Sequence, residues 1–168
     1  VKICATHAGI TLGEDGASHQ SIEDIALMRS IPGMTVLQPS DDIETKQMIK
    51  AISEFDGPCY VRLGRSAVET VNAEDYKFEL GKGVVLREGK DITLIATGMM
   101  VQEAMKASTL LVEQGIEVNV INIHTIKPLD EALILDYAKK SKLVVTCEEH
   151  SKFGGLGSAV AETLSKNH

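Results

Sequence analysis

The sequence has no Trp, only three Phe and three Tyr, and no excess of basic residues. Its 24 acidic and 17 Lys and Arg residues give a net charge of −7 at pH 7. A nucleic-acid-binding protein normally carries a basic stripe, and anionic membranes attract basic surfaces. We therefore expect neither nucleic acid nor a membrane among its partners.

Long apolar runs are absent, so no segment reaches the ~20 apolar residues that a membrane-spanning helix requires. The N-terminus has no basic region followed by an apolar stretch and a cleavage site, so no secretory signal is recognisable. The three cysteines, Cys4, Cys59 and Cys147, match no zinc or redox spacing. We expect a soluble cytoplasmic protein whose thiols are reduced and buried.

An initiating Met is also absent, and the chain opens with Val1–Thr6, a pattern typical of a buried strand. Natural chains rarely start inside an element, so we interpret the 168 residues as part of a longer protein. Hydrophobic residues make up 43%, which is enough for a real core.

Strand-like apolar runs alternate with amphipathic helix-like segments, a pattern typical of an α/β protein with a mainly parallel sheet. A capping box of Ser21 and Asp24 predicts the start of the first helix, and Pro32 its end. Further predicted helices span 41–53, 100–113, 129–139 (opened by Pro128) and 157–165, and predicted strands span 1–6, 34–37, 59–63, 92–96, 118–123 and 143–146.

Residues 67–90 are more polar and predict a linker followed by a small hairpin or edge strand. We place a domain boundary near residue 75. Residues 1–75 would form an incomplete parallel-sheet domain, and residues 76–168 a small doubly wound α/β domain with right-handed crossovers.

A Gly-rich loop, residues 6–19, follows the first strand and carries His7, Glu14, Asp15 and His19. Ligands of open α/β sheets bind beyond the carboxyl ends of the strands. An imidazole can transfer protons near neutral pH, and Asp15 can accept from substrate hydroxyls. The alternative is a tight turn with satisfied histidines. The loop has no Walker or G-x-G-x-x-G pattern and no third nitrogen or sulfur ligand, so we expect no metal site here.

Arg65 lies just beyond the strand 59–63, where its forked guanidinium could bind a phosphate. The alternative is a surface ion pair. Arg62 differs from Arg65 in parity along the strand and should point elsewhere. We interpret Glu148-Glu149-His150 and the glycines after it as a structural or interface segment, and His124 as a structural histidine.

The segment THAGITLGEDGASHQ, with Arg29-Ser30-Ile31-Pro32 and Pro39-Ser40-Asp41 after it, resembles the pyrimidine-binding domain of transketolases. Residues 57–65 resemble the end of that domain. From Asp91 onward the sequence is similar to the family's C-terminal domain, through 126–130 and 148–150. His7-Ala8-Gly9 and His19-Gln20 look most like the split transketolases, whose two halves are separate chains.

The resemblance implies thiamine diphosphate with Mg²⁺ as cofactor and transfer of a two-carbon ketol unit between sugar phosphates. It implies that His7 contacts the substrate near its phosphate and that Asp15 bonds a hydroxyl next to the reacting carbonyl. It places His19 beside the cofactor's aminopyrimidine and the reacting end of the substrate, as a catalytic and cofactor-binding residue. Arg65 matches the phosphate-binding arginine.

Three features of the family are missing from these residues. They are the cofactor-activating glutamate in its Gly-x-x-Glu setting, the aromatic residue that stacks on the pyrimidine, and the Gly-Asp-Gly…Asn motif that binds the diphosphate and metal. The resemblance therefore implies a partner, the N-terminal transketolase section, which carries the metal ligands, and homo-oligomers through the C-terminal sections. We expect the chain alone to be inactive.

Two alternatives remain. One is a fragment of 1-deoxyxylulose-5-phosphate synthase, although that family usually has a second His where this chain has Gln20. The other is a non-catalytic assembly module.

Overall fold

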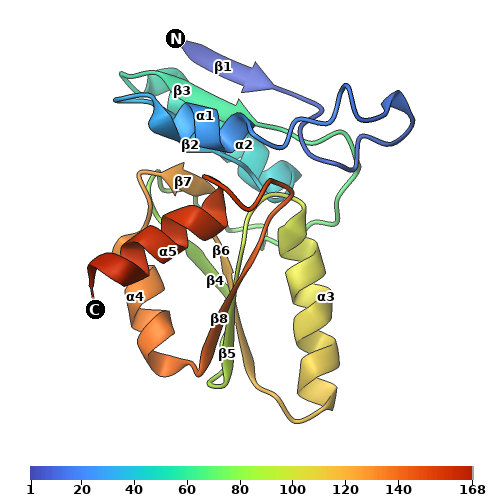
Figure 1. Cartoon of the computed structure of the whole chain (residues 1–168), viewed down its shortest axis with the longest axis vertical. Coiled ribbons are helices and arrows are strands. Elements are labelled where there is room, and N and C mark those ends of the chain that lie inside the picture. Colours follow the sequence, from blue (N-terminus) through green and yellow to red (C-terminus); the bar gives the residue numbers. More distant parts are fainter. Residues whose placement is uncertain (168) are drawn as a thin grey trace.

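Two four-stranded sheets form the centre of the molecule in the computed structural model, which describes residues 1–167 (Figure 1). The first sheet has the order β1 (Lys2–Ala5), β3 (Cys59–Arg62), β2 (Thr35–Leu37), β7 (Thr125–Lys127). The second has the order β4 (Val84–Arg87), β6 (Val118–Asn122), β5 (Ile92–Ala96), β8 (Leu143–Cys147). β7 and β4 run antiparallel to their neighbours β2 and β6, and the remaining pairs of these two sheets are parallel. The predicted α/β class is confirmed.

The helices are α1 (Asp24–Ser30), α2 (Asp42–Glu54), α3 (Met100–Glu113), α4 (Glu131–Lys140) and α5 (Leu156–Lys166), with a short 3₁₀ turn, η1 (Gly13–Asp15). Figure 1 shows α3 on one side of the second sheet and α4 and α5 on the other. Alternation along β5 explains this arrangement, because successive side chains of a strand point to opposite faces. Leu94 and Ala96 pack in the cluster that includes Val101 of α3, whereas Ile95 packs with residues of α4 and α5.

The first strand is more exposed than predicted. β1 is the first strand in the order of its sheet and pairs with β3, so it is an edge strand. Val1 and Ile3 are 91% and 38% exposed. Cys4 lies on this strand and is exposed, which corrects the prediction of three buried thiols. Cys59 is buried and Cys147 is half-buried, and burial raises the pKa of both thiols.

Two predicted helix starts are wrong. The predicted capping box is not formed, because helix α1 begins at Asp24 after Glu23, with no side-chain cap, and the Asp24 carboxylate bonds Arg62 and Tyr60 instead. Helix α4 begins at Glu131, two residues later than predicted, because the Asp130 carboxylate accepts from the Leu133 amide.

Strand β7 was not predicted. It follows β6 closely in the chain, yet it pairs with β2 of the first sheet. Strand β4 pairs with β6 at the edge of the second sheet, so the edge-strand alternative is correct and the hairpin alternative is wrong.

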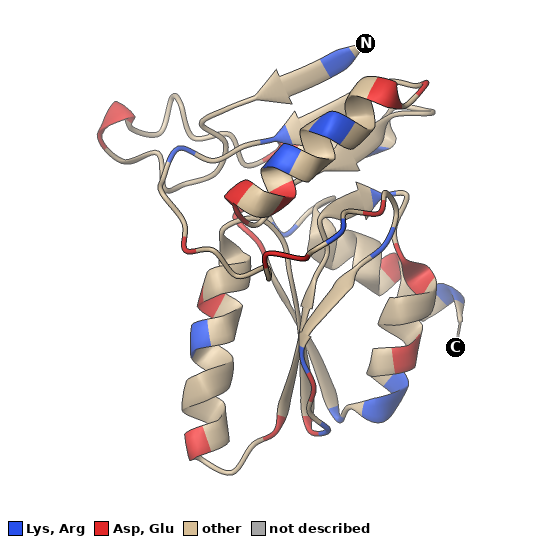
Figure 2. Ribbon diagram, turned by 180° about the vertical axis from the view of Figure 1, so that it is seen from behind, with Lys and Arg blue, Asp and Glu red and all other residues tan. Residues whose placement is uncertain are grey.

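Charged residues of both signs are interspersed along the helices. In α2, Asp42 and Glu44 lie near the first end and Glu54 at the other, with two lysines between them (Figure 2). Within residues 1–167, no helix combines the length and the apolar character needed to cross a membrane.

Candidate functional site

The loop from Thr6 to Gln20 leaves the end of β1 and projects beside the first sheet (Figure 1). Its base is closed where Ala8 pairs with Ser21 and where the Gly9 amide donates to the Ser21 carbonyl, at 2.8 Å. This is the carboxyl end of the parallel strands β1 and β3, the edge at which open α/β sheets bind ligands.

The two predicted histidines of this loop are exposed. His7 has a φ of 68°, and its Nδ1 lies 2.9 Å from the Thr6 hydroxyl. His19 has its Nδ1 3.0 Å from the Ser18 hydroxyl. Within residues 1–167, neither imidazole hydrogen-bonds to Asp15 or Arg65. Within that part of the chain, the Nε2 atom of each imidazole makes no hydrogen bond and is available to a ligand.

Arg65 and Asp15 do come together. Arg65 Nη1 lies 3.5 Å from Asp15 Oδ2, and Arg65 Nη2 lies 3.5 Å from Glu14 Oε1. The same guanidinium donates to the Leu12 carbonyl. In this conformation Arg65 therefore ties the loop together, as the ion-pair alternative predicts, and its side chain remains 38% exposed toward solvent.

Beneath the loop lies a buried cluster that the sequence did not predict. Arg62 is 1% exposed, and its Nε donates to Asp24 Oδ2 at 2.7 Å. The Tyr60 hydroxyl donates to the same oxygen at 2.6 Å. Burial by itself raises the pKa of Asp24, but the hydrogen bonds and charge of Arg62 and the Tyr60 hydroxyl outweigh it and hold that pKa below its usual value. An arginine within an otherwise apolar strand was the available signal.

Glu149 belongs to the predicted structural segment, but the sequence did not indicate which part of the chain it contacts. It follows β8, is 6% exposed, and its Oε1 accepts from the amides of Ile10 and Thr11, at 3.0 and 2.8 Å. The predicted structural segment 148–150 therefore contacts the loop directly.

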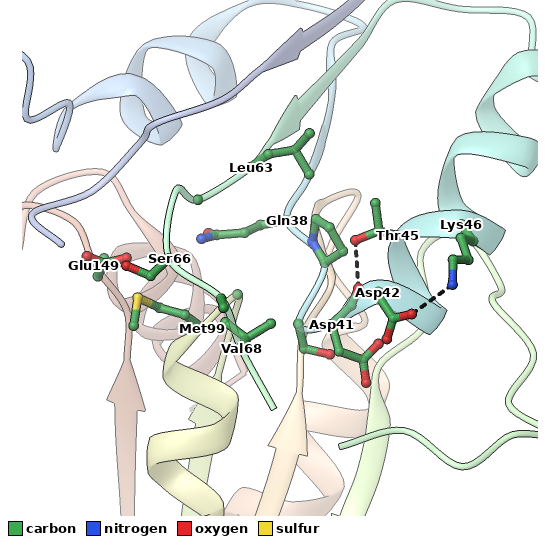
Figure 3. Close-up of a pocket in the computed structure, with 15 residues that line it drawn as sticks. Gln38, Asp41, Asp42, Thr45, Lys46, Leu63, Ser66, Val68, Met99 and Glu149 are labelled. Carbon is green, nitrogen blue, oxygen red and sulfur yellow. Dashed lines mark hydrogen bonds and ion pairs between the residues drawn. The ribbon is translucent and has the colours of Figure 1, made fainter. Parts of the chain in front are cut away.

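A cavity of about 490 Å³ lies between the two sheets, at the starts of α2 and α3 and beside the segment that follows β3 (Figure 3). Gln38 is 4% exposed, and its Oε1 has no hydrogen-bond partner within the described residues 1–167. Asp42 pairs with Lys46 at 2.8 Å. None of the four predicted site residues lines this cavity, although Ser66 and Glu149 do. The cavity is therefore a neighbour of the predicted site and distinct from it.

Among residues 1–167, no group of three or more His, Cys, Asp or Glu side chains is arranged to hold a metal ion.

Comparison with known proteins gives matches along the chain. The family model described as "Transketolase, pyrimidine binding domain" matches residues 1–70, and "Transketolase, C-terminal domain" matches residues 81–168. The "Putative transketolase C-terminal section" of Methanocaldococcus jannaschii is 54% identical over 170 residues, covering 99% of this chain and 52% of that protein. The 1-deoxy-D-xylulose-5-phosphate synthase of Desulforudis audaxviator is 40% identical over 164 residues, covering 96% and 26%.

Among solved structures, a chain described as "Split gene transketolase, inactive beta4 tetramer" matches with a TM-score of 0.92 and 48% identity, covering 99% of this chain and 53% of that one. The chain spans about half the length of the first curated relatives it matches.

Proposed function

This chain belongs to the transketolase family, and we propose that it is part of the C-terminal section of a split transketolase. With an N-terminal section and thiamine diphosphate it would transfer a two-carbon ketol unit between sugar phosphates. The relatives described as a "C-terminal section" and as "split gene" support the division into two chains. The match of the two family models on either side of residue 75 supports our proposed division into domains 1–75 and 76–168.

The observation that carries the proposal is the loop from Thr6 to Gln20. It presents two exposed imidazoles and a carboxylate at the carboxyl end of parallel strands, with a partly exposed guanidinium at its rim. These groups suit a phosphorylated polyol, because imidazoles and guanidinium bind phosphate and a carboxylate accepts from hydroxyls.

We assign roles within this loop. His7 and Arg65 would bind the phosphate end of the substrate, and Asp15 would accept a hydrogen bond from a hydroxyl. His19 would contact the aminopyrimidine and assist proton transfer at the reacting end. Arg65 would exchange its present contact with Asp15 for the phosphate, which frees that carboxylate for the hydroxyl.

The residues of this chain fit the aminopyrimidine part of the cofactor but not its metal-bound diphosphate. The exposed imidazole of His19 can meet an aminopyrimidine, but residues 1–167 supply no cluster of ligands for a metal-bound diphosphate. When bound, thiamine diphosphate would supply the stabilised carbanion. The diphosphate and Mg²⁺ would be held by the N-terminal section, and the related tetramer described as inactive supports the need for that partner.

Reconstitution tests the proposal. The chain, completed to its full coding sequence, is mixed with the N-terminal section, thiamine diphosphate and Mg²⁺, and sedoheptulose 7-phosphate is measured from xylulose and ribose 5-phosphates. We expect turnover in the mixture and none from the 168-residue chain alone. Turnover by the chain alone would contradict the split arrangement.

His19→Ala in the mixture should lower kcat about 100-fold, the scale of lost proton-transfer assistance.

A second candidate is 1-deoxyxylulose-5-phosphate synthase, which the 40% identity to one such enzyme favours. The same mixture supplied with pyruvate and glyceraldehyde 3-phosphate distinguishes the two by release of CO₂. If neither reaction occurs while the two chains still associate, the assembly-module alternative is favoured.

A further inference from the structure

We propose that Glu149 is a positioning residue that holds the loop Thr6–Gln20 in its binding conformation from the other half of the molecule. Glu149 lies in the connection between β8 and α5, which reaches the first sheet from the second (Figure 1). The proposal rests on the proposed function in one respect, namely that this loop carries the substrate-facing residues.

The first support is the carboxylate. Both hydrogen bonds from the loop, from the amides of Ile10 and Thr11, end on one oxygen, Oε1. Glu149 is only 6% exposed, so water cannot readily replace it as the acceptor for these two amides. Two consecutive amides that converge on one oxygen fix the direction of the backbone at that point.

The second support is the backbone of Gly9. Its φ is +93°, a backbone conformation that residues with a side chain rarely adopt. A Cβ added there would lie 2.6 Å from the Glu149 carboxyl carbon. Glycine at this position therefore lets the loop backbone lie directly against the carboxylate.

The third support is the main chain of Glu149. Arg62 Nη2 donates to the Glu149 carbonyl at 2.9 Å and to the Ser21 carbonyl at 3.1 Å. The Ser151 amide also donates to the Ile22 carbonyl, at 2.8 Å. The same short connection thus holds the loop at residues 10–11 and again at 21–22.

Asp15 and His19 lie between these two anchors. Their side chains make few contacts of their own, so their place in the site depends on the backbone that Glu149 and Arg62 hold. A misplacement of about 1 Å can lower turnover about 100-fold. Figure 3 shows Glu149 beside Ser66 and Met99.

Hydrogen exchange of the loop amides tests the anchor without any assay of activity. In the full chain, Glu149→Ala should speed exchange at Ile10 and Thr11 at least 10-fold. Glu149→Gln keeps an acceptor oxygen and should leave the exchange near that of the wild type. Unchanged exchange in the Ala variant would overturn the proposal, as would loss of protection in both variants to the same extent.

Glu148→Ala is the matched control. Glu148 is the neighbouring residue and also accepts from two backbone amides, but those belong to Leu156 and Gly157 at the start of α5. This variant should speed exchange in α5 and leave Ile10 and Thr11 protected. Equal loss of loop protection in both Ala variants would show general destabilisation and would overturn the specific role of Glu149.

The reconstituted enzyme tests the consequence for turnover. Glu149→Ala should lower kcat/KM about 10- to 100-fold, with Glu149→Gln within about 3-fold of the wild type. A Gln variant as impaired as the Ala variant would assign the effect to charge and overturn the positioning role. If the wild type has no activity, the proposed function fails, and the exchange measurements still decide whether Glu149 holds the loop.

Discussion

Two arginines three residues apart have different surroundings. Arg62 lies within β3 and points into the protein, where it pairs with Asp24, whereas Arg65 lies beyond the strand and is partly exposed. The difference in parity predicted that they point in different directions. It did not predict which partner each would have, because Asp24, Ser21 and Glu149 come from elsewhere in the chain.

Arg65→Ala should mainly raise KM for phosphorylated sugars in the reconstituted enzyme. Phosphate binding far from the reacting carbon stabilises ground state and transition state alike, so kcat should change little. Steady-state kinetics with xylulose 5-phosphate and with an unphosphorylated ketose measure this difference. Arg65→Lys keeps the charge without the fork and should be intermediate. Equal effects on both substrates would refute a phosphate-binding role.

His124 should make stability depend on pH. It is fully buried, and its Nε2 has no hydrogen-bond partner among residues 1–167. Burial lowers its pKa below the ordinary 6.5, although Glu44 and Asp130 partly oppose this. The unfolded chain therefore binds the proton more readily. The free energy of unfolding therefore carries no penalty from His124 above about pH 6.5, and it decreases as the pH falls below that value.

Urea unfolding at pH 7.5 and 5.5 checks this effect. The free energy of unfolding of the wild type should be about 1 kcal/mol smaller at the lower pH, which is the scale of a shift by one pKa unit. His124→Asn has no proton to gain at this position, so its stability should change less over the same range. An equal loss in both proteins would assign the pH dependence to other groups.

At the scale of elements, helix α2 shows how a cap also joins segments. Asp41 Oδ1 accepts from the Glu44 amide and so caps the start of α2. Its other oxygen accepts from the amides of Val71 and Asn72, which belong to the segment leading to the second sheet. Asp41 is 3% exposed, so removal of its carboxylate leaves these donors buried.

Asp41→Ala should therefore destabilise the protein by about 3 kcal/mol, which combines the loss of a cap with unpaired buried amides. Asp130→Ala is a suitable comparison, because Asp130 caps α4 and accepts from Leu133 and Gly83 in a less buried setting. We expect about 1–2 kcal/mol there. Chemical denaturation of both variants measures the difference, and equal losses would contradict the joining role of Asp41.

Strand β7 links the two sheets of the molecule. Residues 125–127 follow β6 of the second sheet and pair with β2 of the first. A segment of three residues is too short to show a clear hydrophobic pattern, and its pairing with a distant strand leaves no signal in the neighbouring sequence. The strand was missed for this reason.

At the scale of the whole molecule, β7 and the connection from β8 to α5 both reach the first sheet from the second half. Because both connections are lost when either half unfolds, we predict a single cooperative urea transition. Circular dichroism and hydrogen exchange of strand amides in β2 and β5 would follow the two sheets. Separate transitions would indicate that the halves unfold independently.

The sequence by itself determined the α/β class, most helices and strands, the family and the loop that carries His7, Asp15 and His19. These follow from local periodicity, from turn residues and from a motif in continuous chain. The tertiary structure decided the partners of Asp24, Arg62 and Glu149, the pairing of β7 and the exposure of β1. Such contacts depend on which distant segments meet, and residues far apart in the chain leave no mark on one another's local pattern.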